Sequence, residues 1–166
     1  MTVASILKEK SSNKKSLLAD YNLKNNKLPV GLVRINSDLI DSVLIDALKI
    51  LPANFIIYWK NNNFDNNSNI VFFDDDFNNN GFDFIVCDEC EDSVTDYLKV
   101  WVVPVILGSN KISSLLKEFN TWTIEGNAFI FQNNALCDIY YAIIRYTENY
   151  KFPYDNKALV KNVLAV

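Results

Sequence analysis

The chain has 166 residues, which fits one domain, and its 49% hydrophobic and 22% charged residues are ordinary for a globular protein. Its net charge of −4 argues against broad binding to nucleic acid or anionic membranes, because both require clustered lysine and arginine. The absence of histidine removes the commonest general base and the commonest metal ligand, so we expect no metal site.

The first part of the chain predicts a helix, a buried strand and a second helix. Their expected ranges are Ser12–Tyr21, Pro29–Ile35 and Asp38–Leu51. Ser37 or Asp38 can cap the second helix, because either side chain can accept a hydrogen bond from its first turn, and Pro52 follows its end.

The rest of the chain alternates between short apolar runs and segments with helical periodicity. The predicted strands are Phe55–Trp59, Ile70–Phe73, Phe82–Cys87, Val102–Leu107 and Ala128–Phe131, and the predicted helices are Asp92–Val100, Ser109–Phe119, Leu136–Tyr150 and Asp155–Ala165. This alternation predicts an α/β fold with one doubly wound parallel sheet and crossover helices. We expect a single domain over 1–166, in which residues 1–28 form a helix and linker and residues 29–166 form the core.

Targeting features suggest a cytoplasmic protein without a membrane partner. No apolar run reaches the roughly 18–20 residues that a membrane helix requires, and the first twenty residues lack the apolar segment of a signal peptide. Three cysteines, an odd number, suggest a reducing compartment.

Cys87 and Cys90 form a C-x-x-C pattern between a predicted strand and a predicted helix, which is the position of a thioredoxin-type redox pair. The carboxylates of Asp88, Glu89, Glu91 and Asp92 surround these thiols and oppose thiolate formation. A redox pair and a buried Cys87 with a passive Cys90 both remain open.

Several stretches, taken in chain order, resemble the C-terminal domain of glycogen and starch synthases. They are Asn13–Leu18 with Tyr21–Leu23 (family pattern NK..L....GL), Pro29–Ile35 (P.(I/F)G.VSRL), Trp101–Val105 (GT.PVV) and Glu125–Phe131 (TGNGF.F). The resemblance implies a Rossmann-like parallel sheet flanked by helices, which is the C-terminal half of the GT-B glycosyltransferase architecture.

The resemblance also implies where a nucleotide sugar would bind. In this family an arginine after the first strand and a lysine nearby hold the donor diphosphate. Arg34 matches the arginine, whereas Leu39 stands at the lysine position. The other interpretation of Arg34 is a strand-end arginine paired with a nearby carboxylate.

Two glutamates of the family, which hold the sugar and the ribose, correspond to Asp88 and Asp96 when residues are counted back from Pro104. Counting forward from Asp83 places the first of them near Asp92 instead. Trp101 stands at the glycine of the GT.PVV pattern, where we expect it to fill space that the family keeps for backbone access.

We therefore expect a degenerate donor-binding domain that is glycosyltransferase-like but inactive as an isolated chain, with its catalytic residues unknown. Leu39 cannot replace an ammonium group, and the acidic residues around Asp88 repel a diphosphate. No cofactor is expected, and the candidate ligand is a nucleotide sugar such as ADP-glucose or UDP-glucose, bound weakly. The alternatives are a functional half that works with an N-terminal glycosyltransferase half, and a protein-interaction module on the same fold.

Overall fold

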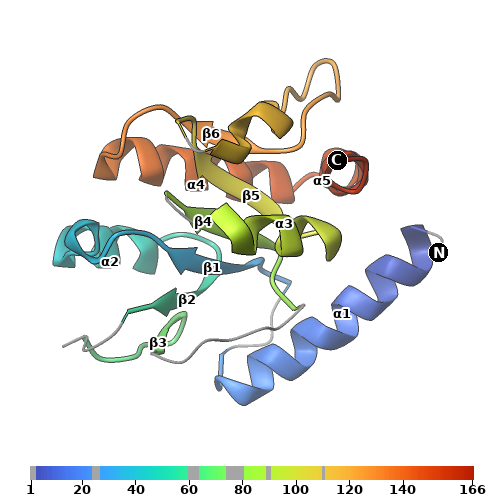
Figure 1. Cartoon of the computed structure of the whole chain (residues 1–166). Helices are drawn as coiled ribbons and strands as arrows, with labels where there is room; N and C mark the ends of the chain where they lie inside the picture. The colour runs from blue at the N-terminus through green and yellow to red at the C-terminus, as the bar shows by residue number, and fades with distance from the viewer. Residues whose placement is uncertain (1–2, 24–26, 60–63, 74–80, 89–90, 110) are drawn as a thin grey trace.

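The computed structural model describes residues 3–23, 27–59, 64–73, 81–88, 91–109 and 111–166. In this part of the chain six strands form one sheet, and every neighbouring pair is parallel (Figure 1). The strands are β1 (Val30–Arg34), β2 (Asn54–Tyr58), β3 (Ile70–Phe73), β4 (Phe84–Cys87), β5 (Val103–Leu107) and β6 (Phe129–Phe131). Their order, β3-β2-β1-β4-β5-β6, is that of the doubly wound dinucleotide-binding fold, so the predicted sheet is confirmed.

The helices cover both faces of this sheet. They are α1 (Val3–Asp20), α2 (Ser42–Lys49), α3 (Glu91–Lys99), α4 (Leu136–Tyr150) and α5 (Pro153–Val163). Helices α2 and α4 contact each other on one face, and α3 lies on the other face, in front of the sheet in Figure 1. None of the helices in the described ranges is both long and apolar enough to cross a bilayer.

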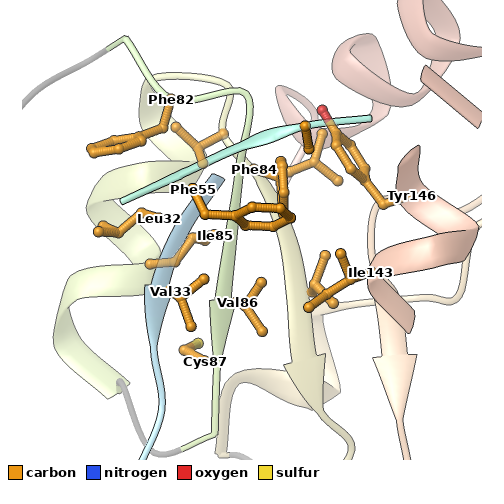
Figure 2. Packing of buried hydrophobic residues seen from close by; sticks show 14 of the residues in the cluster. Leu32, Val33, Phe55, Phe82, Phe84, Ile85, Val86, Cys87, Ile143 and Tyr146 are labelled. Atoms are coloured by element: carbon orange, nitrogen blue, oxygen red, sulfur yellow. The ribbon is translucent and has the colours of Figure 1, made fainter. Parts of the chain in front are cut away.

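Strand positions follow from the apolar runs, because a parallel sheet covered on both faces buries nearly every side chain of its strands. The described core includes Phe84 of β4, which lies between Phe55 of β2 and Tyr146 of α4 (Figure 2). The ring centroids of Phe84 and Tyr146 are 4.4 Å apart, and those of Phe84 and Phe55 are 6.0 Å apart. The Phe84 ring therefore links β2 and α4 across the central strands β1 and β4.

The predicted helix Asp38–Leu51 is broken in two. Ser37–Leu39 forms a short 3₁₀ turn, and α2 starts only after Asp41. The Asp41 carboxylate accepts a hydrogen bond from the Leu44 backbone N–H at 2.8 Å, so Asp41 is the cap and the expectation that Ser37 or Asp38 caps this helix was wrong.

The predicted helix Ser109–Phe119 was also wrong, because only Lys111–Leu115 forms a 3₁₀ turn. The residues after Leu115 are extended because they pair with a later segment of the chain. Glu118 forms a β-bridge with Ala128, and the Asn127 side-chain oxygen accepts from the Lys117 backbone N–H at 2.8 Å. These contacts compete with the hydrogen bonds that a longer helix would need.

The N-terminal helix begins at Val3, nine residues before its predicted start. Its inward positions include Ile6, Lys10, Lys14 and Leu17, which follow helical spacing. Two lysines at inward positions interrupt the apolar pattern, so periodicity alone indicates only the second half of the helix.

Candidate functional site

The candidate site lies at the carboxyl ends of β1 and β4, where the order of the strands reverses direction. The chain leaves β1 toward β2 on one side and leaves β4 toward β5 on the other. In open α/β sheets, ligands bind in the crevice outside the carboxyl ends of the strands at such a switch point. Two of the three site residues predicted from the sequence, Arg34 and Asp88, lie at this point.

Arg34 is the last residue of β1 and is paired in register with Cys87, the last residue of β4. Its guanidinium carbon lies 5.0 Å from the centroid of the Tyr58 ring at the end of β2. Stacking of this kind uses the face of the guanidinium, whereas its N–H donors project from the edge. Arg34 therefore places a cation at the carboxyl edge of the sheet.

Asp88 directly follows β4 and is only 4% exposed. Its Oδ2 accepts a hydrogen bond from the Asn36 backbone N–H at 2.9 Å and from the Asn134 side-chain amide at 3.4 Å. The carboxylate thus joins the loop after β1 to the loop before α4. A carboxylate of the protein itself therefore accepts a hydrogen bond from a backbone N–H group at this edge of the sheet.

The turn after β1 carries two further residues that bear on anion binding. Leu39, at the position where the family resemblance implies a lysine, is partly buried and packs against the core. Asp41 occupies the N-terminus of α2 through its bond to the Leu44 N–H. A helix N-terminus is where a phosphate is normally stabilised, so a carboxylate of the chain already takes this position.

Asp96, the third predicted site residue, lies on an exposed face of α3, where its side chain is 73% exposed. Its Oδ1 accepts a hydrogen bond from Nζ of Lys99, one turn later, at 2.8 Å. The structure thus places Asp96 in an exposed helical ion pair and brings Arg34 and Asp88 to one strand edge. The assignment of Asp96 to a nucleotide sugar stays a prediction.

Trp101 lies away from the candidate site, and the expectation that it fills space kept for backbone access stays a prediction. It precedes β5 and so lies at the amino edge of the sheet, opposite the candidate site. Its φ of 62° is left-handed, and its N–H and that of Val102 bond to Leu98 and Tyr97 carbonyls, each at 3.0 Å. Helices that end with this hydrogen-bond pattern usually have glycine at the left-handed position, where this chain has Trp101. The tryptophan therefore affects packing at the amino edge of the sheet.

The C-x-x-C pattern can be followed only in part. Cys87 is fully buried at the end of β4, whereas Cys90 and Glu89 lie outside the described residues. The redox hypothesis therefore stays a prediction.

Sequence reasoning missed the polar partners of Asp88. Asn36 lies 52 residues and Asn134 46 residues from Asp88 along the chain. Asn36 follows a predicted strand, which was a usable signal because carboxyl ends of neighbouring strands meet. Asn134 had no such signal, because it lies in a loop whose path depends on the whole fold.

No family model matches the sequence, and no curated protein matches it. Among solved structures, the chain is similar to the catalytic domain of starch synthase IV from Arabidopsis thaliana bound to ADP and acarbose, with a TM-score of 0.75 and 16% sequence identity. The match covers 95% of this chain and 39% of that chain. At this identity the likeness establishes the fold, so the predicted Rossmann-like α/β fold of the GT-B kind is confirmed.

Proposed function

We propose that this chain is a glycosyltransferase-type donor domain whose diphosphate site is occupied by its own carboxylates, so that it binds nucleotide sugars weakly and transfers no sugar alone. The observation that carries the proposal is the hydrogen bond from the Asn36 N–H to the buried Asp88 carboxylate at 2.9 Å. A donor diphosphate would need backbone N–H groups at this same strand edge.

The location of Arg34 supports descent of this chain from a nucleotide-sugar-binding domain. It supplies one cation at the switch point of a sheet whose fold is shared with a protein solved with ADP and acarbose. A diphosphate carries about two or more negative charges and is usually held by several charge-assisted hydrogen bonds. Here Arg34 supplies one cation, and Asp88 and Asp41 already accept hydrogen bonds from backbone N–H groups that a diphosphate would use.

The length of the match supports inactivity of the isolated chain. The chain spans 39% of the starch synthase structure that it resembles. Glycosyl transfer requires a donor and an acceptor to be held together in one geometry. The donor side of such an enzyme cannot by itself position the acceptor, even if a donor binds.

We expect no transfer of labelled glucose from ADP-glucose or UDP-glucose to glycogen by this chain. The measurement is incorporation of label into precipitated glycogen, with a starch synthase as the positive control. Incorporation that disappears in Arg34→Ala would contradict the proposal, because it would mean that the crevice performs the reaction without a second half.

A further inference from the structure

A second pocket lies at the amino edge of the sheet, opposite the candidate donor site. It has a volume of about 450 Å³ and is bordered by α1, α4 and α5. In Figure 1, α5 and the first part of α1 lie at the right-hand end of the sheet, where the strands begin, and both helices contribute to the pocket lining. A pocket of this size suits a small molecule, and nothing in the proposed donor chemistry uses it.

The walls of this pocket are strongly basic. Lys10, Lys14, Lys15 and Lys27 contribute four ammonium groups, and among the described residues that line the pocket Asp83 supplies the one carboxylate. That carboxylate is already engaged, because its Oδ2 accepts from Nζ of Lys14 at 2.6 Å and from the Val30 backbone N–H at 2.9 Å. The lining therefore keeps an excess of positive charge in a chain that is acidic overall.

Lys10 is the least expected of these lysines, because it is only 6% exposed. Its Nζ donates to the Trp101 carbonyl, so the left-handed turn after α3 helps to hold it in place. Burial lowers the pKa of Lys10 to about 8, the Asp83 charge opposes this change and the Lys14 charge adds to it. Burying this ammonium group in the wall of the pocket costs desolvation free energy, and a bound anion would offset that cost.

Asn156 of α5 provides an independent sign of an incomplete site. Its side-chain oxygen is buried and, among the described residues, has no hydrogen-bond partner, although the residue lines the same pocket. Buried polar atoms without partners are uncommon in native proteins. A bound molecule with both donor and acceptor atoms could satisfy this amide, which presents either its oxygen or its N–H₂ group.

We propose that this amino-edge pocket binds a small phosphate-bearing anion through Lys10, Lys14 and Lys15. Lysine is a common phosphate ligand that acts as a compact charge with several rotatable donors. The excess of three ammonium groups over carboxylates in the lining matches an anion of two or three charges better than a monocarboxylate. The site is independent of the proposed donor site, from which the sheet separates it.

Titration of the whole chain with inorganic pyrophosphate by calorimetry tests this proposal. We expect saturable binding at one site, and we expect it to weaken as salt is added, because salt screens the charges. Lys15→Gln should weaken binding about two- to five-fold, the effect of losing an exposed ion pair. Lys8→Gln is the matched control, since Lys8 is exposed on the same helix but does not line the pocket.

Lys10→Met should weaken pyrophosphate binding roughly 10- to 150-fold, because a buried charge-assisted contact is lost. Arg34→Ala should leave binding unchanged, which separates this pocket from the crevice at the other edge. The proposal is overturned by absence of saturable binding, by equal losses in Lys15→Gln and Lys8→Gln, by a folded Lys10→Met with unchanged affinity, or by loss in Arg34→Ala. If Lys10→Met does not fold, the Lys15 and Lys8 variants still decide.

Discussion

Replacing Leu39 by lysine and Asp88 by asparagine in the same chain is expected to tighten ADP binding by roughly 10- to 150-fold. The asparagine keeps an oxygen that can accept from the Asn36 N–H, and it removes the negative charge from the crevice. The lysine adds an ammonium group on the turn between β1 and α2, near the helix N-terminus. Both changes favour binding of an anion at the position that the Asp88 carboxylate now occupies.

A control variant with the same change in charge separates this effect from general electrostatics. Ile50→Lys with Asp46→Asn also adds one positive charge and removes one negative charge. Both residues are exposed, and Ile50 caps the opposite end of α2 from the crevice. ADP affinity should change less than about two-fold in this control, because these exposed charges lie away from the candidate site and are screened by solvent and salt. Equal gains in both double variants would mean that the crevice is not where ADP binds.

Gly31→Ala is expected to destabilise the fold by about 3 kcal/mol, at the upper end of the usual cost of overpacking a core. An added Cβ would lie 2.2 Å from Cζ of Phe84, which is far inside contact distance. The Phe84 ring is fully buried and held between Phe55 and Tyr146, so it has little freedom to move away (Figure 2). The loss should appear as a lower urea midpoint with an unchanged slope.

Gly108→Ala is the control for this substitution. Gly108 follows β5, and the nearest atom to an added Cβ is the end of the Gln132 side chain at 3.1 Å, which can shift. Its cost should stay below about 1 kcal/mol. Adding Phe84→Leu to Gly31→Ala replaces the ring that the new Cβ would meet, so it should recover part of the lost stability. Unfolding midpoints that do not distinguish Gly31→Ala from Gly108→Ala would contradict the packing described for β1.

Much of the fold could be predicted from the sequence because buried parallel strands consist of apolar runs with polar ends. β3 and α4 have the predicted bounds, and the other strands differ by one or two residues. The failures arose where long-range contacts decide the local structure. Residues after Leu115 extend because Lys117 and Glu118 pair with Asn127 and Ala128, and none of these contacts leaves a periodic signal.

Of the candidate site, only the residues at the ends of strands could be predicted from the sequence. Arg34 and Asp88 end neighbouring strands, so their approach follows from the order of a doubly wound sheet. The hydrogen bonds of Asp88 could not be predicted from the sequence, because their donors, Asn36 and Asn134, lie in two distant loops. The basic pocket was hidden for a similar reason, since Lys10 and Lys14 look like a solvated helix face until α1 is placed beside α4 and Asp83.

A calorimetric titration of the unaltered chain with ADP tests most directly the proposal that the chain's own carboxylates occupy a diphosphate site. Loss of one charge-assisted phosphate contact weakens binding by roughly 10- to 150-fold, and the charge of Asp88 should weaken it further. We therefore predict a dissociation constant of about 1 mM or weaker, equivalent to no more than about 4 kcal/mol. A sub-micromolar dissociation constant that is lost in Arg34→Ala would contradict the account and would indicate a working donor site.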